Sequence, residues 1–409
     1  MSDHQPPFRG TELGAAAHGL AELPPLVQVA ECELLRRRMA AVARGEAVLL
    51  HIGQGAAPAP APAPSEGSLG ERLGMLLQLA NVLTYATALP VIRIGWMIGQ
   101  GAGVRSAREM YDGSARALNL IRAAIAGWSP DRRRTHDRIR AFAAGWERGA
   151  RHRDRAEETA RGLAFLRACG VDPDRLAGGE FFVGHEGLLP DYEVALTRFG
   201  GDQRPYATSG HLLWMGDRAG GVDGTLVEHF ARIRNPIAVG LGPTTEPDQV
   251  LGLLDRLDPC REPGRLTFVL GAGAGRIRDV LPTLVEKVTA EGALVCWVSD
   301  PVRGNADRTS KGWSACRFDR VLDEVRAFVE VHQALGTHPG GVSLDTGGQR
   351  ATGSATGRAD LPGGLLSGDQ SLDLVFTLAE AYRGRAGADG PLSSNDTATA
   401  IATAKLRPD

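Results

Sequence analysis

The chain has 409 residues and a nearly balanced charge, with 46 basic and 48 acidic side chains. Such a balance leaves no basic footprint for a nucleic acid, and no apolar run reaches the roughly 20 residues that a membrane-spanning helix needs. No signal peptide is recognised at the start, and the five cysteines are scattered without a CxxC pair, which is typical of a reducing compartment. We therefore expect a cytoplasmic protein that binds neither nucleic acid nor a membrane.

Short apolar runs alternate with helical patterns along most of the chain. Residues 27–44 follow a polar arm and carry apolar side chains at helical spacing, which predicts an N-terminal helical extension. Further helices are expected at residues 69–83, 107–170 (with a break at Pro130), 246–257, 280–289, 320–334 and 370–382. The expected strands are residues 47–51, 90–95, 180–183, 211–215, 236–240, 266–270, 293–298 and 342–345.

Eight short strands that alternate with helices predict an α/β protein of the (β/α)8 TIM-barrel class. A doubly wound open sheet is the alternative that the same pattern allows. The expected organisation is an arm and helix over residues 1–44, the barrel over 45–382 and a disordered tail over 383–409, where Gly, Ser, Thr and Asp are frequent. An Ala-Pro alternation after the first strand is expected to form a semi-rigid spacer.

In a barrel, catalytic and binding residues gather at the carboxyl ends of the strands. The polar and aromatic residues that follow the predicted strands are therefore candidates, namely Gln54, Trp96, His185, Glu186, Asp217, Arg218, Arg303 and Asp345. Adjacent strand residues point to opposite sides, so only one of His185 and Glu186 is expected to face the site. Glu186 is favoured as a general acid or base, with a structural ion pair as the alternative. The run from Gly271 to Arg276 could cradle a phosphate, but an ordinary βα loop is favoured because the Walker lysine is missing.

Several strings of the sequence occur in one order in a known family, including Gly45-Glu-Ala-Val-Leu-Leu, Leu213-Trp-Met-Gly, Arg234-Asn-Pro-Ile and Gly336-Thr-His-Pro-Gly-Gly. Over residues 27–382 the chain resembles the class II (plant-type) 3-deoxy-D-arabino-heptulosonate 7-phosphate (DAHP) synthases. The resemblance implies a (β/α)8 barrel that condenses phosphoenolpyruvate with erythrose 4-phosphate and polarises the aldehyde with a divalent metal.

The resemblance also implies where the family's metal ligands, a Cys, a His, a Glu and an Asp, would fall on this chain. The matching residues are Gly55, Arg303, Asp345 and Gly363, with Asp360 near the last of them. Asp345, alone or with Asp360, offers too few ligands for a first-row metal. We therefore expect a divergent member of the family that uses neither a metal nor another cofactor.

The positions that hold phosphoenolpyruvate in the family are also changed. The matching residues are Trp96, Gly240, Gly271 and Arg218, of which only Arg218 keeps its charge. Arg105 and Ser106 keep half of the clamp for the second phosphate. These replacements predict a wider and more apolar pocket, with Trp96 and Trp214 as stacking faces for a bulkier, less anionic substrate.

Together these features favour a repurposed enzyme of specialised metabolism that performs a condensation, cyclisation or elimination by metal-independent acid/base or electrostatic catalysis. The expected catalytic residues are Glu186, Asp217, Arg218, Arg303 and Asp345. The expected substrate-binding residues are Trp96, Arg105, Ser106, His185, Trp214, Asp300 and Asn305. A non-catalytic barrel that partners a pathway enzyme and an authentic DAHP synthase are the alternatives. The leading hypothesis includes a small-molecule substrate and a homodimer.

Overall fold

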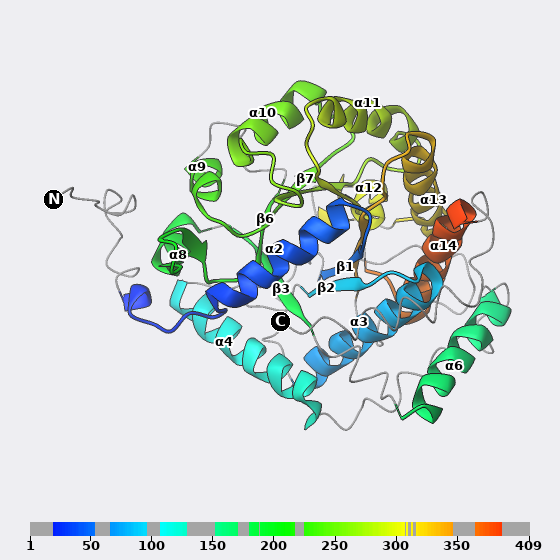
Figure 1. Ribbon diagram of the computed structural model, residues 1–409, viewed down its shortest axis with the longest axis horizontal. Coiled ribbons are helices and arrows are strands. Elements are labelled where there is room, and N and C mark those ends of the chain that lie inside the picture. Colours follow the sequence, from blue (N-terminus) through cyan, green and yellow to red (C-terminus); the bar gives the residue numbers. More distant parts are fainter. Residues whose placement is uncertain are drawn as a thin grey trace.

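A closed barrel of eight parallel strands forms the centre of the protein, and helices surround it (Figure 1). The computed structural model describes residues 19–53, 66–95, 107–128, 152–170, 180–187, 189–216, 225–306, 308–309, 312–313, 316–346 and 365–386. The strand order is β1-β12-β9-β8-β7-β6-β3-β2, and β1 pairs with both β2 and β12. The predicted (β/α)8 class is therefore confirmed, and the open doubly wound sheet is excluded because the sheet has no free edge.

The barrel strands are β1 (Val48–Gly53), β2 (Val91–Gly95), β3 (Phe182–Glu186), β6 (Leu212–Met215), β7 (Ile237–Leu241), β8 (Leu266–Leu270), β9 (Cys296–Ser299) and β12 (Gly341–Asp345). Two antiparallel hairpins lie outside the barrel, β4 (Thr197–Phe199) with β5 (Pro205–Ala207) and β10 (Arg308–Thr309) with β11 (Gly312–Trp313). The helices are α2 (Val29–Ala43), α3 (Glu66–Thr87), α4 (Ala107–Ala123), the π-helical turn η1 (Ala124–Trp128), α6 (Arg153–Ala168), α8 (Pro190–Ala195), α9 (Thr225–Arg232), α10 (Pro247–Leu257), α11 (Ile277–Ala290), α12 (Pro301–Asn305), α13 (Phe318–Ala334) and α14 (Gly368–Ala386).

Helix α2 crosses the amino-terminal end of the barrel (Figure 1). Its buried residues Met39 and Val42 share one cluster with the side chains of the barrel interior. Gly264 and Gly340, which precede β8 and β12, lie directly against these two residues of α2. The Cys296 thiol of β9 donates a hydrogen bond to the Met39 carbonyl oxygen at 3.3 Å. The N-terminal helix therefore covers the amino-terminal end of the barrel.

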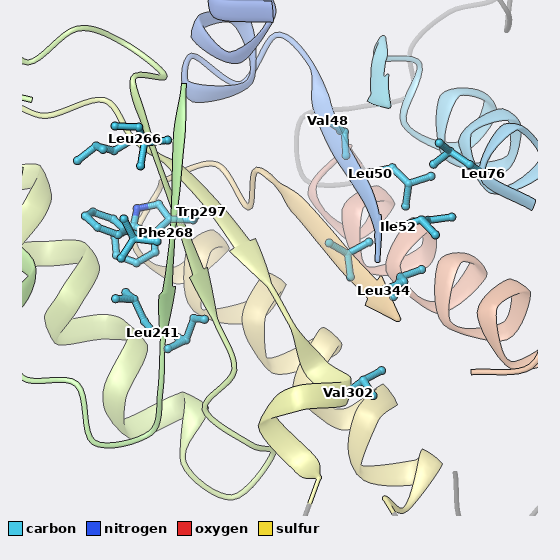
Figure 2. Packing of buried hydrophobic residues seen from close by; sticks show 14 of the residues in the cluster. Val48, Leu50, Ile52, Leu76, Leu241, Leu266, Phe268, Trp297, Val302 and Leu344 are labelled. Carbon is cyan, nitrogen blue, oxygen red and sulfur yellow. The ribbon is translucent and has the colours of Figure 1, made fainter. Parts of the chain in front are cut away.

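Side chains of the strands alternate between the barrel interior and the surrounding helices. In β1, Val48, Leu50 and Ile52 belong to the outer core and face Leu76 of α3 (Figure 2), whereas Leu49 belongs to the interior cluster. Each such fully buried aliphatic side chain contributes about 1.5–3 kcal/mol to folding. The same alternation makes the odd-numbered residues of β1 and β12, and the even-numbered residues of β3 and β6, face the interior.

The predicted elements differ from the structure mainly at their ends and in short segments. All eight predicted strands are present, but the third continues to Glu186 instead of ending at Val183, so that Glu186 belongs to the strand and not to the loop. The short elements α8, α9, α12 and the β4–β5 hairpin were not predicted. The long helical stretch predicted over residues 107–170 contains α4, η1 and α6, and residues 129–151 lie outside the described ranges.

Two predicted segments cannot be compared with the structure. Residues 54–65, which include the Ala-Pro spacer, and residues 387–409, which make up most of the predicted tail, lie outside the described ranges. The division into arm, barrel and tail therefore stays a prediction. None of the described helices combines the length and the apolar character that crossing a membrane would require.

Candidate active site

Two carboxylates point into the barrel from the carboxyl ends of their strands. Phe182 of β3 belongs to the interior cluster and Val183 to the outer one, so alternation places Glu186 on the interior side. On β12, Val342 and Leu344 belong to the outer cluster, which places Asp345 on the interior side as well. Both predicted catalytic acids that the structure describes thus face the same end of the barrel, opposite α2.

Each of these carboxylates lies over a glycine of the neighbouring chain segment. A Cβ atom on Gly53 of β1 would collide with the Asp345 carboxylate, and a Cβ atom on Gly216, directly after β6, would collide with the Glu186 carboxylate. Gly53 is paired with Asp345 in the parallel ladder. The two glycines therefore provide the space in which the carboxylates are held, a role that the sequence analysis did not identify.

A histidine lies beside Asp345 in the barrel interior. The His51 ring approaches the same missing Cβ of Gly53, and its Nδ1 atom is hydrogen-bonded to the Ser343 hydroxyl at 2.8 Å. Burial lowers the pKa of His51 to about 4. The ring centroid of Trp214 lies 5.5 Å from that of His51. Trp214, predicted as a stacking face for substrate, is thus 6% exposed and packed against a buried imidazole; its assignment to substrate stays a prediction.

Arg303 and Asp300 belong to the short helix that follows β9. Asp300 is the N-cap of α12, and its carboxylate accepts a hydrogen bond from the backbone N–H of Arg303 at 3.3 Å. Pro301 at the first helical position favours this helix start, because its missing N–H would have no partner there. Arg303, which is partly buried, and Asp300, which is buried, are therefore placed by the same capped turn at the carboxyl end of β9.

The structure corrects the expectation that Gly271 widens the pocket. A Cβ atom on Gly271 would come within 3.0 Å of the Gly304 nitrogen and 3.1 Å of the Asp300 carbonyl oxygen. The space that this glycine leaves is filled by the backbone of α12, which approaches β8 closely at this point. Because Gly271 has no side chain, two backbone segments can pack together here, and the glycine opens no cavity at this point.

Asn305 at the end of α12 is bonded to the protein on both sides of its amide group. Its Nδ2 atom donates to Glu324 Oε2 at 2.5 Å and to the Pro301 carbonyl oxygen at 2.8 Å, and its Oδ1 atom accepts from the Ala274 N–H at 3.0 Å. These contacts join two loops of the barrel. The predicted contact of Asn305 with substrate stays a prediction.

His185 does not join the carboxylates in the barrel interior. Its side chain lies on the helix side of β3, where Nε2 is 2.7 Å from Glu193 Oε1 of α8 and the ring meets Tyr192 edge-on. Glu193 Oε2 in turn accepts a hydrogen bond from the Ser209 hydroxyl at 2.5 Å. His185 and Glu193 are both almost completely buried. The geometry thus gives His185 a buried hydrogen-bonded partner on the helix side of β3, and it leaves Glu186 facing the interior. The assignment of His185 to substrate stays a prediction.

Several predicted site residues lie outside the described ranges. They are the predicted catalytic residues Asp217 and Arg218, the predicted substrate-binding residues Trp96, Arg105 and Ser106, and the positions Gly55, Asp360 and Gly363. They follow β1, β2, β6 and β12 in the chain. Their assignments stay predictions.

Comparison with known proteins identifies the family. The model of the class-II DAHP synthetase family matches residues 2–110 and 107–368. The chain belongs to the class-II DAHP synthetase family. A phospho-2-dehydro-3-deoxyheptonate aldolase from Streptomyces coelicolor is 41% identical over 432 aligned residues, which cover 93% of this chain and 95% of the relative. The phospho-2-dehydro-3-deoxyheptonate aldolase AroG from Mycolicibacterium smegmatis is 36% identical, over 89% of each chain.

One solved structure, a truncated form of 3-deoxy-D-arabino-heptulosonate 7-phosphate synthase from Thermotoga maritima, aligns over 84% of this chain and 88% of its own. Its TM-score of 0.37 and sequence identity of 12% are too low to support a conclusion about this member of the class-II DAHP synthetase family.

These relatives overturn the expectation of a repurposed, metal-independent enzyme of specialised metabolism. Both carry the name of one activity, and each is similar to this chain along nearly its whole length. That expectation rested on the few ligand positions that the resemblance implies, whereas the similarity to the relatives extends over most of the chain. The class-II DAHP synthetase family is a family of enzymes. The authentic DAHP synthase, one of the two alternatives in the sequence analysis, therefore becomes the leading hypothesis.

The metal that the family resemblance implies does not fit the donor atoms in the described part of the chain. No three His, Cys, Asp or Glu side chains among the described residues are grouped so that they could hold a metal ion. Arg303, which the resemblance places at the family's histidine ligand, has a guanidinium group that offers no lone pair to a cation. Gly55 and Gly363, which the resemblance places at two further ligands, lie outside the described ranges.

Proposed function

We propose that this protein is a phospho-2-dehydro-3-deoxyheptonate aldolase that, as the family resemblance implies, condenses phosphoenolpyruvate with erythrose 4-phosphate. The observation that carries the proposal is the 41% identity to the Streptomyces coelicolor enzyme of that name over 93% of this chain and 95% of the relative. Similarity of this extent covers nearly the whole of both chains, so it supports a shared activity more strongly than a shared fold alone would.

The balance of the reaction defines what the site must do. A new carbon–carbon bond joins C3 of phosphoenolpyruvate to the aldehyde carbon of erythrose 4-phosphate, water adds at C2, and inorganic phosphate leaves, so that the seven-carbon product keeps one phosphate group. The aldehyde oxygen becomes a hydroxyl group and takes up a proton. The site therefore needs groups that hold anions and a group that transfers protons.

Three described residues supply such groups in this proposal. Glu186 and Asp345 face the barrel interior, and a carboxyl group there can accept the proton of the attacking water or deliver one to the aldehyde oxygen. The Arg303 guanidinium can hold a phosphate, carboxylate or carbonyl oxygen through charged hydrogen bonds. Asp217 and Arg218, Trp96, Arg105 and Ser106 complete the proposed site. The finer feature of the proposal is a changed ligand set, with Arg303 and Asp345 where the resemblance implies a histidine and a glutamate.

Turnover of the two substrates by the purified protein tests the proposal. Phosphoenolpyruvate consumption and phosphate release would be measured together, with added Mn²⁺ and with a chelator, and the metal content of the same sample would be determined. The Streptomyces coelicolor relative, assayed in parallel, shows that the conditions support the reaction. We expect equal amounts of both changes; a folded sample that produces neither, while the relative is active, would refute the proposed function.

A further inference from the structure

A buried carboxylate outside the barrel interior holds the loop after β8. Glu324 of α13 is 0% exposed. Its Oε1 atom accepts hydrogen bonds from the backbone N–H groups of Ala272 at 3.0 Å and Gly273 at 3.1 Å. A full charge is almost never buried unless it is bonded in this way. Since Glu324 lies 51 and 52 residues further along the chain than Gly273 and Ala272, the contact is a purely tertiary one.

The other oxygen of the same carboxylate reaches the helix after β9. Glu324 Oε2 accepts a hydrogen bond from Asn305 Nδ2 at 2.5 Å, and Asn305 Oδ1 accepts from the Ala274 N–H at 3.0 Å. Three consecutive N–H groups of the loop, those of residues 272, 273 and 274, are thus bound by two side chains. The anion-binding arrangement suspected in this glycine-rich run is therefore occupied by a carboxylate of the protein itself.

Two glycines make this junction possible. Gly273 has a φ of +82°, a conformation that disfavours other residues, and a Cβ atom there would lie 2.7 Å from the Gly304 carbonyl oxygen. A Cβ atom on Gly304 would lie 2.6 Å from Glu324 Oε2 and 2.7 Å from Oε1. The backbone of the loop after β8 therefore contacts the backbone of α12, and the Glu324 carboxylate of α13 packs against Gly304. This packing leaves little freedom for any one of the three segments to move alone.

The junction carries residues of the proposed site. Helix α12 is only five residues long and includes Arg303, and Asp300 caps it. Asn305 lies at the end of this helix, so a shift of Asn305 would move Arg303 with it. We propose that Glu324 is a positioning residue, which acts through Asn305 and the loop of residues 271–276 to hold Arg303 and Asp300 at the mouth of the barrel. This inference rests on the proposed function for its effect on catalysis, but its effect on the loop does not.

Opposing effects act on the pKa of the Glu324 carboxyl group. Burial raises the pKa of Glu324 to about 8, and the negative charge of Asp300 contributes to the rise, whereas the N–H donors of Gly273, Ala272 and Asn305 oppose it. The N–H groups of Ala272, Gly273 and Asn305 all donate to this carboxylate, which favours its ionised form. A neutral amide at this position can satisfy the two backbone donors but meets a second NH₂ group at Asn305.

A reciprocal exchange of the two side chains tests the proposal. Glu324→Gln sets the amide of residue 324 against the amide of Asn305, and Asn305→Asp sets two carboxylates against each other. The double variant E324Q/N305D restores a donor opposite an acceptor, although the Pro301 carbonyl oxygen loses its partner, so partial rescue is expected. Glu330→Gln is the matched control, since Glu330 lies on the same helix with its side chain 57% exposed. Amide hydrogen exchange of residues 271–276 and steady-state kinetics would be measured on all four variants and the wild type.

We expect faster exchange of this segment in both single variants, wild-type exchange in E330Q and partial restoration in the double variant. The same order is expected for kcat, with a fall of about 10- to 100-fold in the single variants. Wild-type exchange in E324Q would refute the junction, and fast exchange with unchanged kcat and KM would refute its role in positioning Arg303. If the wild type does not turn over phosphoenolpyruvate, the proposed function fails, while the exchange data still decide whether Glu324 holds the loop.

Discussion

The carboxylate of Asp345 lies in the space that Gly53 leaves open on the neighbouring strand. The pairing of β1 with β12 closes the barrel, so the first and the last barrel strands of the chain together form this part of the mouth. Gly53 is the last residue of β1, and the space beside it holds an acidic side chain that faces the interior.

Gly53→Ala is expected to displace the Asp345 carboxylate without unfolding the barrel. The added methyl group meets the end of a side chain, which can rotate, and the backbone of Gly53 is not in a left-handed conformation. We expect kcat of the proposed reaction to fall at least about 10-fold, with a change below about 1.5 kcal/mol in the free energy of unfolding. Gly74→Ala in α3 is the control, since nothing lies within 4 Å of its missing Cβ. Wild-type kinetics in G53A would show that the position of Asp345 is unimportant.

Gly264→Ala is expected to destabilise the closed end of the barrel. Gly264 has a φ of +71°, and a Cβ atom there would collide with the backbone of Met39 and Ala40 in α2, which cannot move without displacing the helix. Gly292→Ala is the matched control, because Gly292 has a φ of +68° but nothing within 4 Å. We expect a loss of about 1 kcal/mol in the control and about 3 kcal/mol or more for G264A, measured by urea denaturation. Equal losses in the two variants would show that α2 does not press on this turn.

His332 is expected to make the stability fall in mild acid. Burial, together with the charge of His338, lowers the pKa of His332 to about 3, and Nδ1 is hydrogen-bonded to the Thr337 hydroxyl at 2.7 Å. Between pH 6.5 and about 3 the unfolded chain binds a proton at this residue that the folded protein does not, so stability is fully present above pH 6.5 and falls below it. From pH 7 to pH 5 the loss is roughly 2 kcal/mol for this residue.

His332→Gln isolates this contribution, since other buried histidines such as His51 are common to both proteins. The free energy of unfolding of the variant should change less with pH than that of the wild type, by roughly 2 kcal/mol over this interval. Parallel pH profiles for the two proteins would mean that His332 takes up its proton in the folded state as well.

Loss of the Glu193 carboxylate is expected to lower stability and to leave substrate affinity unchanged. Glu193→Ala removes the carboxylate that bonds both His185 and Ser209 in a buried setting. Each buried polar group left without its partner costs about 1–3 kcal/mol. Glu228→Ala is the control, because Glu228 forms a half-exposed pair with Arg256 that is worth below about 1 kcal/mol. A raised KM for phosphoenolpyruvate with unchanged stability in E193A would contradict this expectation and support the predicted role of His185 in substrate binding.

The pattern of apolar runs in the sequence predicted the barrel fold and several of the residues at the carboxyl ends of its strands. Apolar runs of four to six residues predicted each barrel strand, because a strand covered by helices on one side and by the interior on the other has no solvent-facing position. The ends of those runs then located Glu186, Arg303 and Asp345, since carboxyl ends of parallel strands meet at one end of a barrel. The resemblance over nearly the whole chain predicted the family correctly.

Only the tertiary structure showed which of these residues lie together, and what occupies the space beside a glycine. His185 and Glu186 are neighbours in sequence, but side chains alternate along β3. The His185 side chain therefore points toward Glu193, and the Glu186 side chain points into the barrel. Gly271 reads as an empty space in the sequence, and in the structure that space is filled by α12. Glu324 had no local signal at all, because its partners lie 19 to 52 residues away. The local sequence pattern reflects the periodicity of a single helix or strand. Contacts between loops depend instead on how the eight strands close into a barrel.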